Sequence, residues 1–163
     1  MPKSSSPAAP AASPIAPITT VRNCADALFR AAIECCRQHD RAARISAADE
    51  PALEHKHLDA LCAMCDGSLA ELAEAYNTAA ADVHPVAADE EWWHRANSLW
   101  HASREFARRH AGCEDLSKRL SARRSAEHLG SMQMEYELEA SSLLALRHAA
   151  DSYRKTRPDL AAS

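Results

Sequence analysis

The sequence predicts an all-α fold, an antiparallel up-down-up-down four-helix bundle. Its 163 residues are 47% hydrophobic but only 5% aromatic, and they include only 3 glycines. Alanine supplies much of the hydrophobic share, and it loses the least free energy on entering a helix. Apolar residues recur every three or four positions, whereas no segment shows the alternation typical of a strand. A chain of this length can bury one hydrophobic core.

Residues 1–18 are predicted to form a disordered tail rich in proline, alanine and serine. Prolines interrupt this tail at positions 7, 10, 14 and 17, so it lacks the unbroken apolar segment of a signal peptide. The remaining sequence has no run of about 18 apolar residues, the length from which a transmembrane helix is expected. We therefore expect a cytoplasmic protein without a membrane partner, in which residues 19–163 form a single helical-bundle domain.

The first two helices are predicted from apolar periodicity and from the residues at their ends. The first spans residues 21–46 and is capped by Thr19 or Thr20. The second begins at Pro51, which suits the first position of a helix because its missing N–H costs nothing there. It ends near residue 83, because the proline that follows disfavours a helical conformation in the residue before it.

The last two helices are predicted to differ in length. The third spans residues 89–112, with Gly112 as its C-terminal stop. The fourth spans residues 113–157 and ends before Pro158. It is longer than the others, and we expect Gly130 to kink or split it.

Charge alternates along the four expected helices. The net charge is +3 over residues 1–46, −10 over 47–92, +5 over 93–124 and −2 over 125–163. Sequential helices are neighbours in an antiparallel bundle, so helices of opposite charge would pack side by side. The basic third segment would then face acidic neighbours, and we expect no nucleic-acid partner.

Four of the six cysteines fall at one level of the first two helices. Cys35 and Cys36 precede the break near residues 46–51 by about as many residues as Cys62 and Cys65 follow it. If the two helices fold back on each other there, Cys35 faces Cys62. A thiolate metal site, a redox pair and an ordinary cysteine-containing core are all consistent with this arrangement.

Histidines are expected near the same level. His39 lies about one turn closer to the break, near His57, and the end of the third helix brings His110 and Cys113 to this end of the bundle. Thiolate and imidazole ligands suit Zn²⁺ or Cu(I). The candidate metal ligands are Cys35, Cys36, Cys62, Cys65, His39 and His57.

The step from Cys62 to Cys65 carries two distant resemblances. It resembles the CxxC steps that line copper-storing four-helix bundles, which implies Cu(I) binding, although this chain has only one such step. It is also similar to the CxxC of helical alkylhydroperoxidase-like proteins, which implies thiol redox chemistry. In that family a histidine follows the motif by four residues, and Leu69 occupies that position here.

The sequence favours a non-enzymatic interaction or structural protein. No catalytic or cofactor-binding residue is predicted, since no nucleophile motif or phosphate-binding loop is present. Trp92, Trp93 and Trp100 cannot all share one narrow helix face, so at least one is expected on the bundle flank, where it would support a homodimer. The alternatives are a small bundle that binds zinc or Cu(I) and a thiol-redox protein that uses Cys62 and Cys65.

Overall fold

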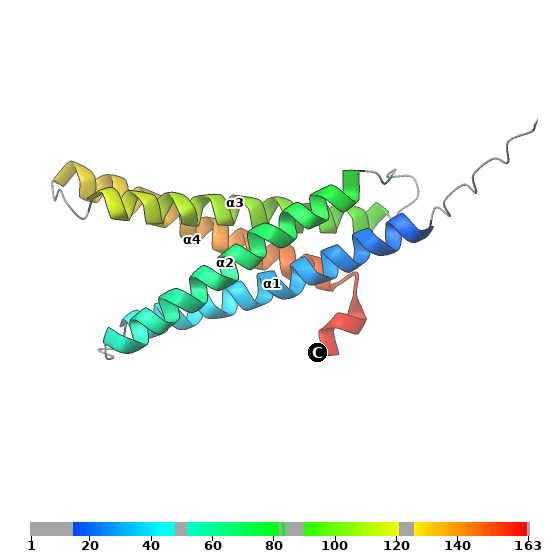
Figure 1. Ribbon diagram of the computed structural model, residues 1–163, viewed down its shortest axis with the longest axis horizontal. Helices are drawn as coiled ribbons and strands as arrows, with labels where there is room; N and C mark the ends of the chain where they lie inside the picture. The colour runs from blue at the N-terminus through cyan, green and yellow to red at the C-terminus, as the bar shows by residue number, and fades with distance from the viewer. Residues whose placement is uncertain (1–14, 48–51, 82, 84–89, 121–125, 163) are drawn as a thin grey trace, which may run out of the picture.

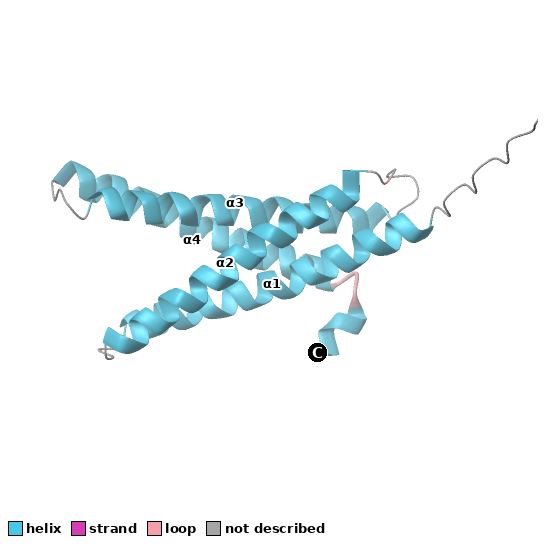
Figure 2. Ribbon diagram, viewed as in Figure 1, coloured by secondary structure: helices cyan, strands magenta, loops and turns pink. Residues whose placement is uncertain are grey.

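The described residues form four long α-helices, which confirms the predicted all-α, four-helix fold. The computed structural model describes residues 15–47, 52–81, 83, 90–120 and 126–162. The helices and the 3₁₀-helix that follows them are coloured in Figure 2, and their bounds are α1 (Ile15–Ala47), α2 (Ala52–Ala81), α3 (Glu90–Leu120), α4 (Ala126–Arg154) and η2 (Pro158–Ala162). No strand occurs in these ranges.

The four helices are arranged as two pairs. Helix α1 packs mainly against α2, and α3 packs mainly against α4, while contacts between the pairs are fewer. The pairs approach each other near the C-terminal end of α2 and diverge toward the C-terminal ends of α1 and α3 (Figure 1). The molecule therefore has one end where four helices share a core and another where each pair extends separately.

Several helix ends differ from those expected. Helix α1 begins at Ile15, before the predicted start at residue 21, so residues 15–18 are helical rather than part of a tail. Proline is tolerated in the first turn, where its missing N–H has no helical partner, so Pro17 does not prevent this earlier start. The rest of the expected tail, residues 1–14, lies outside the described residues.

The predicted stop at Gly112 is wrong, because α3 continues through it to Leu120. A helical glycine costs only about 1 kcal/mol relative to alanine, so one glycine does not have to end a helix, and Cys113 directly after it is buried. Helix α4 therefore begins at Ala126 and is no longer than its neighbours. Gly130 lies within that helix, and the expected kink there remains a prediction.

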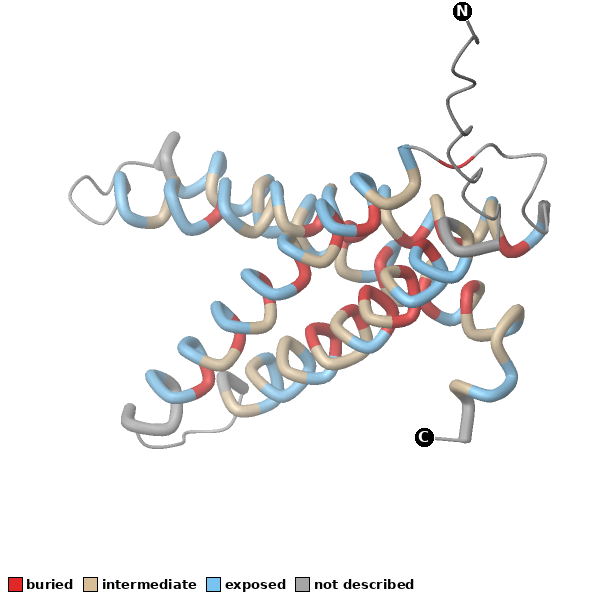
Figure 3. Tube along the Cα trace, turned by 45° about the vertical axis from the view of Figure 1, so that its right-hand side comes forward, coloured by how far each residue is buried: buried red, intermediate tan, exposed pale blue. Residues whose placement is uncertain are grey.

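The hydrophobic core lies where the two pairs meet. Buried side chains of all four helices form one core cluster there. In Figure 3, which colours the Cα trace by burial, the buried residues are red. The largest fully buried apolar side chains are Tyr76, Tyr153, Phe106, Leu28, Leu69, Leu99 and Leu146. Among the described residues, no helix combines the length and the apolar character that a membrane span requires.

Buried polar contacts tie the C-terminus to this core. The Tyr153 hydroxyl donates a hydrogen bond to Asp26 at 2.7 Å and accepts one from the indole N–H of Trp92 at 3.2 Å. The guanidinium of Arg157 donates to both carboxylate oxygens of Asp26, at 2.8 and 2.6 Å. These bonds join α1, α3 and the end of α4, so they satisfy a carboxylate that would otherwise be costly to bury.

Candidate functional site

A cluster of polar side chains lies directly beyond the hydrophobic core, where the two pairs begin to diverge. The core ends at Cys36 in α1, begins at Leu69 in α2 and ends at Phe106 in α3. One helical turn further along these three helices are the side chains of the cluster, which α4 completes: His39, Asp66, His110 and Glu139. Each of the four helices therefore contributes one of these side chains, and Cys35 of α1, which contacts Asp66, is the fifth member of the cluster.

Asp66 is the centre of the cluster. Its Oδ1 atom accepts a hydrogen bond from the thiol of Cys35 at 3.1 Å and lies 3.0 Å from Nε2 of His39. Its Oδ2 atom lies 3.0 Å from Nε2 of His110. Burial alone would raise the pKa of Asp66, but the hydrogen bonds from His39 and Cys35 lower it overall. The carboxylate is thus ionised at neutral pH, and it links α2 to two other helices, α1 and α3.

His110 lies between two carboxylates. Its Nε2 faces Asp66, and its Nδ1 makes a short hydrogen bond to Glu139 Oε1. The bond to Glu139 raises the pKa of His110, burial lowers it by less, and the charge of Asp66 raises it further. Both nitrogens must carry a proton to serve both carboxylates, so in this arrangement His110 is an imidazolium.

Aromatic packing fixes the orientation of His39. Its ring makes an edge contact with Phe106 at a centroid distance of 5.1 Å and with the ring of His110 at 5.2 Å. Phe106 is fully buried, so it offers a fixed surface on which the imidazole rests. This packing and the contact of Nε2 with Asp66 hold the imidazole from two sides.

The cluster contains two overlapping groups of potential metal ligands. The donor atoms of Cys35, His39 and Asp66 all lie within 4.8 Å of one another. Those of His39, His110 and Glu139 form a second group by the same measure. Thiolate, imidazole and carboxylate are the three ligand types that zinc takes in proteins.

The charges of the cluster make the stability of the metal-free protein depend on pH. The pKa of His110 is raised above its ordinary value of 6.5. Protonated His110 therefore contributes its full stabilisation below pH 6.5, and this stabilisation is lost as the pH rises through the pKa of the folded state. The pKa values of Asp66 and Glu139 are lowered from 3.8 and 4.5, so their contributions are complete above pH 4.5 and are lost as pH falls.

We therefore expect the unfolding temperature of the metal-free protein to be highest between pH 4.5 and 6.5, the interval set by these reference values. Thermal melts followed by circular dichroism across pH 3 to 9 would measure it. The variant His110→Ala should lose the decline on the alkaline side of this interval. An identical alkaline decline in that variant would show that His110 is not its source.

Two of the six predicted metal ligands, Cys35 and His39, lie in the cluster. We expected Cys35 to face Cys62, but its hydrogen bond goes to Asp66, one turn further along α2. Cys36 is also buried, yet it lies beside Arg147 of α4, which lowers the pKa of this thiol by less than burial raises it. Neighbouring residues of α1 thus meet different helices.

The other three predicted ligands lie outside the two donor groups. Cys62 is buried, and burial raises its pKa to about 11. Cys65 is half-buried, and His57 is exposed. The prediction that these three bind metal is not tested by their placement and remains a prediction.

Asp66 and Glu139 were not among the predicted site residues, although the sequence carried a signal for both. Each carboxylate interrupts an apolar stripe: Asp66 stands between Cys62 and Leu69, and Glu139 between Tyr136 and Leu143. A buried charge is costly unless it is paired. A carboxylate at a core position therefore indicates a partner, and the partner here is His110.

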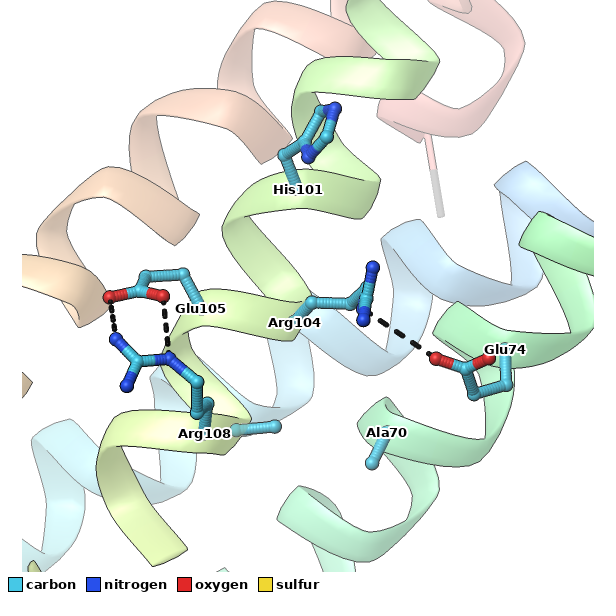
Figure 4. A pocket seen from close by; sticks show the side chains of 7 residues that line it. Ala70, Glu74, His101, Arg104, Glu105 and Arg108 are labelled. Carbon is cyan, nitrogen blue, oxygen red and sulfur yellow. Dashed lines mark hydrogen bonds and ion pairs between the residues drawn. The ribbon is translucent and has the colours of Figure 1, made fainter. Parts of the chain in front are cut away.

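A separate groove lies between α2 and α3. It has a volume of about 560 Å³ and is lined by Ala70, Glu74, His101, Arg104, Glu105, Ala107 and Arg108 (Figure 4). Arg108 pairs with Glu105 on the same helix, and Arg104 reaches Glu74 of α2 at 3.6 Å. Hydrogen bonds from Arg108 and Arg109 lower the pKa of Glu105 to about 2. Since these groups are paired with one another, the groove offers no strong site for a charged ligand.

Comparisons with protein-family models, with curated proteins and with solved structures found no match to this chain. The geometry of the cluster is therefore the basis on which its chemistry is argued.

Proposed function

We propose that this protein binds a zinc ion through Cys35, His39 and Asp66, which we call the zinc triad. The observation that carries the proposal is the convergence of all three donors. Asp66 Oδ1 is 3.1 Å from the sulfur of Cys35 and 3.0 Å from Nε2 of His39. An ordinary core would leave a thiol and an imidazole among apolar neighbours, whereas here both are directed at one carboxylate oxygen.

These distances are close to those around a zinc ion. Zinc lies about 2.0–2.2 Å from nitrogen and oxygen ligands and about 2.3 Å from sulfur, so tetrahedral donors are roughly 3.4 Å apart. The two distances to Asp66 Oδ1 would need to lengthen by only a few tenths of an ångström, and the third pair of donors already lies within 4.8 Å. Binding would replace the proton that Cys35 shares with Asp66, since the thiolate is the form that ligates metal.

The neighbouring side chains support the same assignment. Asp66 would use Oδ1 for the ion while Oδ2 accepts a hydrogen bond from His110, which Glu139 orients in turn. Carboxylate ligands in metalloproteins are commonly held by such outer hydrogen bonds. The chain from Asp66 through His110 to Glu139 therefore gives the site a second layer of support from α3 and α4.

The donor set favours zinc over Cu(I). Cu(I) prefers several soft sulfur ligands, and the zinc triad supplies only one thiolate. Zinc accepts mixed sulfur, nitrogen and oxygen ligands. Because the zinc triad joins α1 to α2, and Asp66 joins them to the second pair, the ion would stabilise the region where the two pairs diverge.

Two adjacent cysteines provide a matched test. We expect Cys35→Ala to weaken zinc binding by about 100-fold or more, because it removes a ligand, and Cys36→Ala to leave it unchanged within about twofold. Competition with a chromophoric chelator under reducing conditions would measure both affinities. Equal affinities in the two variants would refute the zinc triad. His57→Ala would test in the same assay whether that exposed histidine takes part.

Self-association is a second candidate function, as the sequence suggested, and the surface of α4 favours it. Large apolar side chains are exposed along its first half: Leu129, Met134, Tyr136 and Leu138. The tryptophans are less exposed than these residues, since Trp92 is buried and the other two are half-buried. Sedimentation equilibrium of the wild type and of Tyr136→Ser would show whether this face mediates a dimer.

A further inference from the structure

A second group of donors lies in the polar cluster beside the zinc triad. The donor atoms of His39, His110 and Glu139 all lie within 4.8 Å of one another. They come from three helices, since His39 belongs to α1, His110 to α3 and Glu139 to α4. We call these three residues the second donor group. It shares His39 with the zinc triad but contains no sulfur, so it supplies two imidazoles and one carboxylate.

The second donor group is partly buried and already assembled. The side chains of His39, His110 and Glu139 are 15%, 19% and 17% exposed. His110 Nδ1 makes a short hydrogen bond to Glu139 Oε1, and the ring of His39 packs edge-on against that of His110 at a centroid distance of 5.2 Å. The three donors are therefore close to one another before any ion binds.

A cavity adjoins the second donor group. It has a volume of about 260 Å³, and its lining consists of His110, Cys113, Glu114, Ser117, Lys118, Tyr136 and Glu139. A single water molecule needs only about 10–15 Å³ of such volume. An ion that is held by three protein ligands keeps at least one open position for water. The cavity has room for the water molecules that would complete its coordination shell.

The donor types of the second donor group favour a different cation from that of the zinc triad. Two imidazoles and one carboxylate with open positions are the ligand set typical of Fe²⁺ sites, and carboxylate and water also suit Mn²⁺. A thiolate ligand favours zinc instead. Because it lacks sulfur, the second donor group favours a cation of the Mn²⁺ and Fe²⁺ class.

We propose that the second donor group, His39, His110 and Glu139, binds a divalent cation of the Mn²⁺ and Fe²⁺ class as an alternative to zinc at the zinc triad. On binding, the proton that His110 Nδ1 donates to Glu139 is released to solvent. The freed nitrogen and the carboxylate oxygen become ligands, together with one ring nitrogen of His39. His110 Nε2 meanwhile continues to donate its hydrogen bond to Asp66.

The two ion positions exclude each other because both need His39. A neutral imidazole has one nitrogen lone pair for a metal, and it would have to lose both ring protons to bind two ions. Two divalent cations within such closely spaced donor groups would also repel each other. The cluster therefore holds one ion at a time. This exclusion rests on the proposed function, whereas cation binding by the second donor group does not.

Electron paramagnetic resonance with Mn²⁺ tests the site itself, because the signal of free Mn²⁺ diminishes when the ion binds. The wild type should bind one equivalent. Glu139→Gln should weaken this binding by about tenfold or more, whereas Glu137→Gln, which changes an exposed glutamate of the same helix, should match the wild type. Cys35→Ala removes a ligand of the zinc triad and should still bind Mn²⁺. If Glu139→Gln fails to fold by circular dichroism, Glu139→Asp replaces it and should also weaken binding.

Three results would overturn the second donor group. They are a wild type that does not bind Mn²⁺, equal Mn²⁺ affinities in Glu139→Gln and Glu137→Gln, and loss of Mn²⁺ binding in Cys35→Ala. The last result would place the ion at the zinc triad.

Co²⁺ tests the exclusion, because a cobalt–thiolate bond gives a charge-transfer absorption band. Co²⁺ added to the Mn²⁺-loaded wild type should produce this band and release one Mn²⁺ for each Co²⁺ bound. A band that appears while Mn²⁺ stays bound would contradict the exclusion. Mn²⁺ binding in a protein that never gives the band would refute the zinc triad and leave the second donor group standing.

Discussion

Replacing Asp66 with asparagine is expected to reduce zinc affinity by at least about 100-fold. The carboxylate would supply one of the three ligands, and it also accepts the bonds that orient Cys35, His39 and His110. An amide keeps the shape of the side chain but loses its charge and one of its acceptor atoms. The metal-free variant should also lose about 3 kcal/mol of stability, because the partly buried imidazolium of His110 loses one of its two carboxylate partners.

Asp59→Asn is the matched control, since Asp59 is an exposed aspartate on the same helix. It should change neither zinc affinity nor stability by a measurable amount. Chelator competition gives the affinity, and urea unfolding of the metal-free proteins gives the free energy. Zinc affinity that is the same in Asp66→Asn and Asp59→Asn would contradict the proposed role of Asp66.

The variant Phe106→Ala is expected to lower the free energy of unfolding by about 3–5 kcal/mol. Phe106 is fully buried in α3 at the point where the core meets the polar cluster. Its removal leaves a cavity, and it also takes away the ring surface on which His39 rests. For a chain of this length, each kcal/mol corresponds to roughly 2–4 °C in unfolding temperature.

Phe106→Ala should also bind zinc more weakly than the wild type, because the imidazole of His39 is then less restrained and loses more conformational freedom on binding. Phe106→Leu keeps most of the apolar volume and should cost less in both measurements. Thermal melts with and without zinc would compare the three proteins. A destabilised Phe106→Ala with wild-type zinc affinity would show that the ring does not position His39.

The helical fold could be predicted from the sequence because it depends on local properties. Alanine content and apolar spacing identify helices wherever they occur, and the break near residue 50 was marked by Pro51. The end of α3 was harder to predict, because a glycine such as Gly112 is a common residue after the end of a helix but is also tolerated inside one. Helix α3 runs through Gly112 to Leu120, and Cys113 directly after the glycine is buried, a fact that no local sequence pattern records.

The candidate site could be predicted only in part. The sequence placed Cys35 and His39 near a metal-binding level, and it brought His110 and Cys113 toward the same end. It could not give the register of α1 against α2 to better than one turn. That turn decides whether Cys35 meets Cys62 or Asp66, and it changes a cysteine cluster into a mixed set of donors.

The angle between the two helix pairs was also outside the reach of sequence patterns. Because the pairs diverge beyond the core, the side chains at the point of divergence are polar, and half-buried groups such as His39 can be satisfied there. Asp66 and Glu139 each interrupt an apolar stripe, and such an interruption is the feature of the sequence that indicates a buried polar site. A carboxylate at a core position indicates that another helix supplies its partner.

The most direct test of the central claim is the zinc content of the tag-free wild-type protein, purified under reducing conditions and measured by inductively coupled plasma mass spectrometry. We expect zinc to remain bound through gel filtration and to be removed by a strong chelator, with a simultaneous rise in titratable thiols. Loss of this zinc in Asp66→Asn would tie it to the cluster. A wild-type protein that neither retains zinc nor takes it up on addition would contradict the account.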